Sequence, residues 1–209
     1  MNEHKHPSQI LTPAIADLLE PLTKAALPIT QELEKSYLFQ TFNDPQLEAM
    51  LQAAERFRLD MEAGARPRWI TFLGNSGAGK TYLADKLKTK APSELNYHSS
   101  LLKGTCRWEW VKLLSKLREE EYWRLNDIAD ANLAMIDDIG TEAGTKFSSE
   151  KLFELLARRT RKWTIITANM SLEQVAQKID PRVASRMIRD GSEVVDVACQ
   201  DFSMRTRKS

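Results

Sequence analysis

The spacing of hydrophobic residues divides the chain into two patterns that meet near residue 66. Before that point, apolar side chains recur every three or four residues, which predicts helices beginning near Thr12, Thr30 and Asp44. Thr12 and Asp44 are capping residues, and a proline follows each at the first helical position. Gly64 and Pro67 end the third helix. The first part of the chain is therefore predicted to be helical.

Beyond residue 66, short apolar runs alternate with segments of helical spacing. The predicted strands are 69–73, a weaker candidate at 95–98, 133–136, 163–168 and 193–197. The predicted helices are 80–90, 108–117, 148–162, 172–178 and 183–188. Strands that alternate with helices are typical of a mostly parallel sheet with helices on both faces. The pattern thus predicts an α/β fold with a central, mostly parallel five-stranded sheet.

A glycine-rich turn follows the first predicted strand and opens a helix. Its sequence, Gly74-Asn75-Ser76-Gly77-Ala78-Gly79-Lys80-Thr81, satisfies the P-loop pattern G-x-x-x-x-G-K-[ST] in full. Glycines allow backbone N–H groups to curl around phosphate oxygens at the start of a helix. Lys80 is then expected to reach the β- and γ-phosphates, and the Thr81 hydroxyl to bind Mg²⁺. The motif predicts a site for a nucleoside triphosphate.

Two carboxylates follow the apolar run at 133–136. Asp137 is expected to orient Mg²⁺ through its water shell, and Asp138 to position or deprotonate the attacking water. The strand at 163–168 is followed by Asn169, and a parallel sheet places this amide beside the carboxylates. Asn169 is therefore expected to orient the lytic water, with capping of the turn as its alternative role.

Two arginines, Arg182 and Arg186, are spaced to share one helical face. Arginine is the residue that stabilises phosphoryl-transfer charge from a neighbouring subunit. A solvated basic face is the alternative interpretation, and the spacing alone leaves both open.

Taken together and in order, these motifs resemble the AAA+ helicase-loader family typified by DnaC and DnaI, which includes the IstB transposition helpers. The resemblance covers roughly residues 39 to 203 and rests on the segments 72–84, 136–140, 166–169 and 182–187. The double aspartate followed by Ile139-Gly140 is fairly specific, because most AAA+ proteins have Asp-Glu there. Tyr82 is a departure, since many members have histidine after the Lys-Thr pair.

The resemblance implies an AAA+ ATPase fold with a role for each motif. Residues 74–82, Tyr82 included, would bind ATP, with Lys80 and Thr81 on ATP·Mg²⁺. Asp137 and Asp138 would form the Walker B pair, and Asn169 would be sensor 1. Arg186 would be the arginine finger, with Arg182 as its substitute, which implies self-association through the ATP site. The chain ends about a dozen residues after the last predicted strand, so no C-terminal helical lid is expected.

The 209 residues carry a net charge of +1, which argues against a uniformly basic nucleic-acid binder. The charge is unevenly spread. Residues 1–66 contain 6 basic and 10 acidic side chains, which leaves 24 basic and 19 acidic ones for residues 67–209. Because this asymmetry coincides with the change of pattern, we predict a helical partner-binding region at 1–66 and an AAA+ ATPase domain at 67–209.

Basic residues surround Trp108 and Trp110, namely Lys103, Arg107, Lys112 and Lys116. In loader-type ATPases this region is implied to line a path for single-stranded DNA, and basic residues interleaved with aromatic ones suit such a groove. Packing of the tryptophans in the core is the equal alternative.

The leading hypothesis is an ATP-dependent replication protein that binds a DnaB-type hexameric helicase and delivers it to single-stranded DNA, with hydrolysis stimulated by assembly or DNA. The nearest alternative is an IstB-like transposition helper that binds duplex DNA and a transposase. A P-loop small-molecule kinase is the third, but the pattern contains neither an acceptor pocket nor an arginine-bearing lid. No apolar run is long enough to cross a membrane, and the sequence predicts a cytoplasmic protein with two reduced cysteines.

Overall fold

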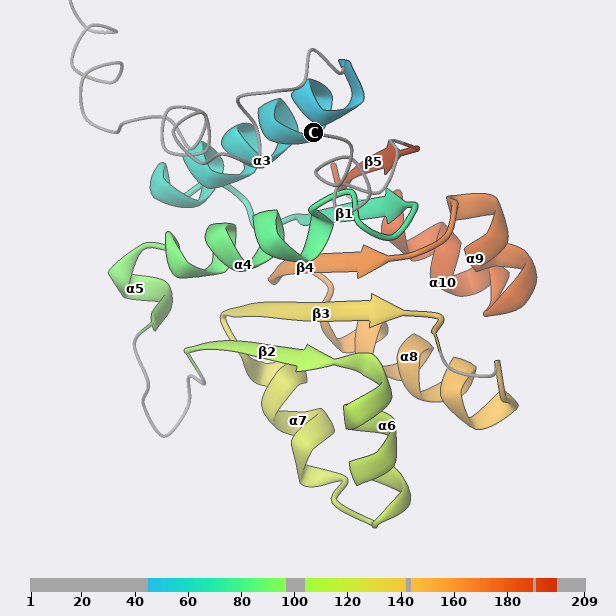
Figure 1. Ribbon diagram of the computed structural model, residues 1–209. Coiled ribbons are helices and arrows are strands. Elements are labelled where there is room, and N and C mark those ends of the chain that lie inside the picture. Colours follow the sequence, from blue (N-terminus) through green and yellow to red (C-terminus); the bar gives the residue numbers. More distant parts are fainter. Residues whose placement is uncertain (1–44, 97–103, 142–143, 190, 199–209) are drawn as a thin grey trace, which may run out of the picture. The chain divides into compact units, whose positions relative to one another are not determined.

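The computed structural model describes residues 45–96, 104–141, 144–189 and 191–198 (Figure 1). The predicted helices beginning near Thr12 and Thr30 lie outside these residues, as does Lys103. Within the described ranges, no helix has both the length and the apolar character needed to cross a membrane.

A five-stranded parallel sheet forms the centre of the structure (Figure 1). The strands are β1 (Trp69–Gly74), β2 (Thr105–Glu109), β3 (Leu133–Ile139), β4 (Trp163–Ala168) and β5 (Glu193–Val197). Their spatial order is β2-β3-β4-β1-β5, and each neighbouring pair is parallel. The carboxyl ends of all strands therefore meet at one edge of the sheet. The predicted fold class is confirmed.

Helices cover both faces of the sheet. On one face, α3 (Pro45–Glu62) packs against β1 and β5, and α4 (Lys80–Thr89) packs against β3 and β4. A short helix, α5 (Ser93–Asn96), follows α4. The apolar cluster of the other face contains residues of α6 (Trp110–Arg118), α7 (Trp123–Asp130), α8 (Lys146–Arg158), α9 (Leu172–Lys178) and α10 (Pro181–Met187). Coverage on both sides explains why β1 and β4 are buried at every position.

The predicted helix after Asp44 is present as α3, and it contacts the sheet through an aromatic pair and ion pairs. Phe57 meets Trp163 of β4 edge to face, with 5.1 Å between ring centroids. Arg68 donates to Asp60 at 2.8 Å and to Glu193 of β5 at 3.4 Å. α3 belongs to the same compact unit as the sheet, although the charge asymmetry grouped this helix with residues 1–66. The partner-binding role of residues 1–66 stays a prediction.

The edge strand β2 differs from the sequence-based expectation. The candidate strand at 95–98 begins inside α5, and the strand lies at Thr105–Glu109 instead. Cys106 and Trp108 pack against the core cluster, whereas Arg107 is exposed, which is the period of two of a strand covered on one side. Trp108 also fits the helical spacing of the residues after it, so the sequence assigned it to a helix that in fact begins at Trp110.

Arg159 is fully buried and joins the end of α7, a helix that the sequence pattern did not predict, to the start of β4. Its guanidinium donates to the carbonyl oxygen of Ile128 at 3.1 Å and to that of Ala131. It also donates to the carbonyl oxygen of Trp163 and to Oγ1 of Thr164, the latter at 3.1 Å. Burial lowers the pKa of Arg159 to about 10, so the side chain is still charged at neutral pH.

Replacement of Arg159 by Met should lower the free energy of unfolding by about 3 kcal/mol or more, because several buried carbonyl groups lose their donor. Arg158→Met is the matched control on the neighbouring residue. Arg158 contacts Asn126 and Asp130 at the surface, and its loss should cost less than about 0.5 kcal/mol. Urea unfolding followed by circular dichroism measures both variants. Equal losses would contradict the structural role of Arg159.

Candidate functional site

A cleft of about 370 Å³ lies at the carboxyl edge of the sheet. Its walls come from the loop between β1 and α4, from the end of β2, and from the polar residues at the ends of β3 and β4. The lining residues are Ser76, Gly77, Ala78, Gly79, Lys80, Thr81, Tyr82, Glu109, Asp137, Asp138 and Asn169. The structure therefore brings the glycine-rich loop, both aspartates and the asparagine into one cleft.

The loop has a backbone conformation that glycine adopts most readily. Gly74, Gly77 and Gly79 have φ values of 112°, 77° and 80°. At Gly74 the neighbouring strand also approaches closely, since a Cβ there would lie 2.0 Å from the carbonyl oxygen of Val197. Gly79 precedes the first turn of α4, and no side chain caps that turn. The N–H groups of this turn are thus donors for an anionic ligand such as a phosphate.

Lys80 is buried at the start of α4, and its ammonium group lies within the loop. It donates to the carbonyl oxygens of Gly74, at 3.0 Å, and of Asn75. It also donates to Oδ1 of Asn169 at 3.0 Å, which joins the loop to the end of β4. These contacts hold the ammonium group inside the loop, where a phosphate would meet its charge.

Asp137 is buried and accepts hydrogen bonds from three elements of the fold. Its Oδ1 accepts from Oγ1 of Thr81 in α4 at 2.9 Å and from Oγ1 of Thr167 in β4 at 2.7 Å. Its Oδ2 accepts from Nη2 of Arg107 in β2 at 2.7 Å. These three contacts bring α4, β4 and β2 to the end of β3.

The side chains of Thr81 and Asp137 fit a magnesium ion bound with a nucleotide. A hydroxyl next to a carboxylate oxygen is a donor set that Mg²⁺ uses together with phosphate oxygens and water. Among the described residues, no group of three or more His, Cys, Asp or Glu side chains is placed to hold a metal.

Asp138 has a left-handed backbone conformation, with φ of 59°. The pairing register of β3 and β4 shifts at this point, and such irregularities redirect side chains at the end of a strand. The backbone N–H of Asp138 donates to Oγ1 of Thr167 at 2.9 Å. Nδ2 of Asn169 donates to Oδ1 of Asp138 at 2.6 Å. A strained non-glycine residue held in place from two sides of a polar cleft is typical of a functional site.

Two residues that line or support this cleft were not identified from the sequence. Thr167 donates to Asp137 and accepts from the N–H of Asp138, so its hydroxyl fixes both aspartates. A threonine inside a fully buried strand, two positions before Asn169, was an available signal, because a buried hydroxyl needs partners. Glu109 pairs in register with Asp137 and lines the cleft. It was missed because β2 had been placed elsewhere.

Comparison with protein families identifies the relatives of this chain. The model of a family described as "IstB-like ATP binding protein" matches residues 18–209. The chain belongs to this family. Among curated proteins, none matches it significantly.

Solved structures share the fold of this IstB-like protein. DnaI is 20% identical with a TM-score of 0.63, over 82% of this chain and 93% of that one. The DnaC helicase loader is 20% identical with a TM-score of 0.61, over 77% and 95%. The replication initiator DnaA, solved with AMPPCP and single-stranded DNA, is 16% identical with a TM-score of 0.59, over 78% and 50%. The resemblance to the DnaC/DnaI-like family that includes IstB is confirmed, and the chain is a P-loop ATP-binding protein.

The two arginines predicted to share a helical face do so in the IstB-like chain. Arg182 and Arg186 of α10 lie over the ring of Phe153, with their guanidinium carbons 4.4 and 4.6 Å from its centroid. With Arg189 they line an open cavity of about 320 Å³. Neither Arg182 nor Arg186 is among the residues that line the cleft around Lys80.

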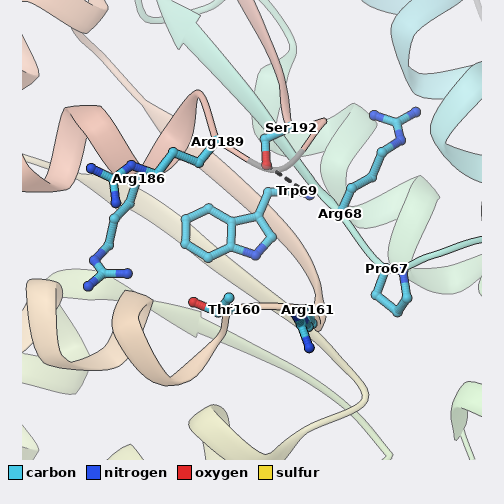
Figure 2. Close-up of a pocket in the computed structure, with 8 residues that line it drawn as sticks. All are labelled: Pro67, Arg68, Trp69, Thr160, Arg161, Arg186, Arg189 and Ser192. Carbon is cyan, nitrogen blue, oxygen red and sulfur yellow. Dashed lines mark hydrogen bonds between the residues drawn. The ribbon is translucent and has the colours of Figure 1, made fainter.

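Arg186 also faces a second, much smaller cavity near the start of β1. Figure 2 shows Arg186 and Arg189 on one side of the Trp69 ring, with Thr160 below it. The backbone N–H of Trp69 donates to Oγ of Ser192 at 3.4 Å, which joins β1 to the segment before β5. The volume is about 20 Å³, enough for roughly one water molecule and too small for a nucleotide.

Two of the lysines predicted to contact DNA, Lys112 and Lys116, are among the described residues, and both are paired with acids. Lys112 donates to Glu109 at 2.8 Å, and Lys116 donates to Glu119 at 2.8 Å. Arg107 contacts Asp137, as described above, so its guanidinium lies at the nucleotide cleft. Partial burial lowers the pKa of Arg107. The hydrogen bond to Asp137 and the charge of Asp137 have a larger effect in the opposite direction, so the pKa of Arg107 is raised overall.

The aromatic residues of this region separate into buried and exposed ones. Trp110 is fully buried, and Trp108 packs partly against the core, with Arg124 5.2 Å above its ring. The exposed aromatic residues are Tyr122 and Trp123 at the start of α7, which are 48% and 54% exposed. Packing therefore accounts for Trp110, and the large accessible rings lie on α7.

Replacement of Gly74 by Ala should lower the free energy of unfolding by roughly 3 kcal/mol or more, because both the positive φ and the carbonyl of Val197 oppose a Cβ. Gly64→Ala is the matched control: Gly64 has φ of 62°, but no atom lies within 4 Å of a Cβ there. Gly64→Ala should lower the free energy of unfolding by about 1 kcal/mol, because only the strain of the backbone opposes the new side chain. Thermal and urea unfolding measure the difference. Similar losses at both positions would show that β5 does not constrain the loop.

Proposed function

We propose that this IstB-like protein is an ATP-driven loader that delivers a DnaB-type hexameric helicase to single-stranded DNA. The observation that supports this most is the cleft, in which a complete phosphate-binding loop faces two aspartates and an asparagine. The likeness of the fold to DnaI and to the DnaC helicase loader supports this function among those of P-loop proteins.

Each residue of the cleft has a chemical role in this proposal. Lys80 and the N–H groups of the loop bind the phosphates of ATP. Thr81 and Asp137 hold Mg²⁺, which neutralises phosphate charge when it is bound. Asp138 holds the attacking water and accepts its proton, and Asn169 keeps the carboxylate of Asp138 in position through its amide. The protein is therefore proposed to be an ATPase.

Arg186 is proposed to act on the nucleotide of a neighbouring copy. It lies outside the cleft of its own chain, stacked on Phe153, and its Nε is buried without a hydrogen-bond partner among the described residues. A guanidinium that has no carboxylate partner in the part of the chain that the structure describes is suited to a phosphate that arrives with another subunit. Arg182 is less suited, because Asp180 accepts from it at 2.8 Å.

Single-stranded DNA is proposed to bind on the side of α6 and α7. Lys112 is exposed and Lys116 is partly exposed on α6, and Tyr122 and Trp123 are exposed at the start of α7. Cations that track phosphates beside rings on which bases stack are the usual means of binding single strands.

The second candidate function is that of a transposition helper that binds duplex DNA and a transposase. The match of the IstB-like family model over residues 18–209 supports it. The ATP site is common to both functions, so the partner protein distinguishes them.

The proposed function is tested with the full chain, a DnaB-type hexameric helicase and circular single-stranded DNA. The helicase should be retained by the tagged chain, and ATP should increase the amount of helicase on the DNA several-fold. Lys80→Ala should weaken ATP binding about 100-fold and abolish this increase, because the phosphates lose a charged partner. Lys88→Ala, on the same helix but outside the cleft, should behave as the wild type. Retention of a transposase and not of the helicase would instead favour the second candidate.

The role of Arg186 in a neighbouring site is tested by mixing variants. Arg186→Ala should bind ATP normally but hydrolyse it at least tenfold more slowly in the assembly, whereas Arg189→Ala should not. Asp138→Asn, which keeps a residue tolerant of positive φ, should also be inactive. A mixture of Arg186→Ala and Asp138→Asn should regain activity, because some interfaces then combine an intact site with an intact arginine. A mixture as inactive as its components would contradict action between subunits.

A further inference from the structure

Arg107 makes a contact that the proposed hydrolysis does not use. Its Nη2 donates to Oδ2 of Asp137 at 2.7 Å, and its Nη1 donates to Oδ1 of Asp85 at 3.3 Å. The side chain of Asp137 is 3% exposed, whereas those of Arg107 and Asp85 are 35% and 47% exposed. One arginine thus spans a buried carboxylate in the cleft and an exposed carboxylate outside it.

Arg107 bonds to Oδ2 of Asp137, the carboxylate that is proposed to hold magnesium. Oδ1 of Asp137 already accepts from two hydroxyl groups, those of Thr81 and Thr167. With Oδ2 bonded to Arg107, the charge of the buried carboxylate is balanced by a guanidinium. A guanidinium and a divalent cation on the same carboxylate repel each other, so the two compete for Asp137.

We propose that Arg107 is the internal counter-ion of Asp137 in the metal-free protein, and that it releases Asp137 and bonds to Asp85 alone when magnesium binds. This inference rests on the proposed ATP·Mg²⁺ site and adds to it a residue that sets the magnesium requirement. Arg107 is a positioning residue in this account, since it acts through the carboxylate of Asp137.

The fold allows the transfer without a change of the backbone. Asp85 lies one helical turn after Thr81 on α4, and Arg107 is already within hydrogen-bond distance of it. Arg107 extends from β2, the edge strand of the sheet, on the side that faces α4. Its long side chain therefore gives up the bond to Asp137 and keeps the bond to Asp85 by rotation of its own torsions, and its charge keeps a partner in both states.

The competition is tested by measuring the Mg²⁺ concentration that gives half-maximal binding of a fluorescent ATP analogue to the full chain. Arg107→Gln should lower this concentration about tenfold, the effect of removing a competing ion pair that contributes on the order of 1 kcal/mol. Asp85→Asn should raise it several-fold, because the displaced guanidinium loses its second carboxylate. Arg118→Gln removes the same charge from the exposed end of α6 and should leave the concentration unchanged.

The affinity for the analogue in EDTA separates competition from a general effect on the site. Arg107→Gln should not increase this affinity, because the proposal concerns the metal alone. Arg107→Lys keeps the charge with a single donor group, so its Mg²⁺ concentration for half-maximal binding should lie between those of the wild type and Arg107→Gln. This variant replaces Arg107→Gln in the test if Arg107→Gln does not fold. An unchanged magnesium requirement in both Arg107 variants, or shifts of Asp85→Asn and Arg107→Gln in the same direction, would overturn the inference. A wild-type chain that binds no analogue at all would instead reject the proposed function.

Discussion

The rest of the site depends on the hydrogen bonds and the ion pair that stabilise the buried carboxylate of Asp137. A carboxylate is stable in a protein interior only if hydrogen bonds and opposite charge replace its hydration. Here the replacements come from Thr81 on α4, Thr167 on β4 and Arg107 on β2. Meeting this single requirement fixes the phosphate-binding helix, the central strand and the edge strand relative to β3.

The irregular end of β3 gives the two neighbouring aspartates different surroundings. In a regular strand, consecutive side chains point to opposite faces of the sheet. The register shift and the positive φ of Asp138 change this, and the carboxylate lies in the same cleft as Asp137 and bonds to Asn169. Thr167 stabilises the arrangement by bonding to both residues. One buried hydroxyl therefore bonds to the carboxylate of Asp137 and to the backbone of Asp138.

The sequence predicted the parts of this site that are determined locally. The glycine-rich loop, the two aspartates and Asn169 follow apolar strands, so their position at one edge of a parallel sheet could be expected from the order of the elements. Arg107 and Glu109 could not be placed in the same way, because they depend on the register of β2 against β3. The strand itself was misplaced, since an edge strand with one covered face has too weak an apolar pattern beside the helical face of α6.

Long-range contacts account for the other differences from the sequence-based expectation. Arg159 falls within the predicted helix at 148–162, yet it lies just beyond the end of α8, is fully buried and bonds to carbonyl groups of α7 and β4. No local pattern distinguishes such an arginine from its exposed neighbour Arg158. Arg182 and Arg186, in contrast, were correctly expected on one face, because that prediction needed only the helical repeat.

A structure of the chain with Mg²⁺ and a non-hydrolysable ATP analogue tests the account most directly. The account predicts phosphates on the N–H groups of the loop and on Lys80, magnesium at Thr81 beside Asp137, and the guanidinium of Arg107 on Asp85. A nucleotide bound elsewhere, or a metal at Thr81 with Arg107 still bonded to Asp137, would contradict it.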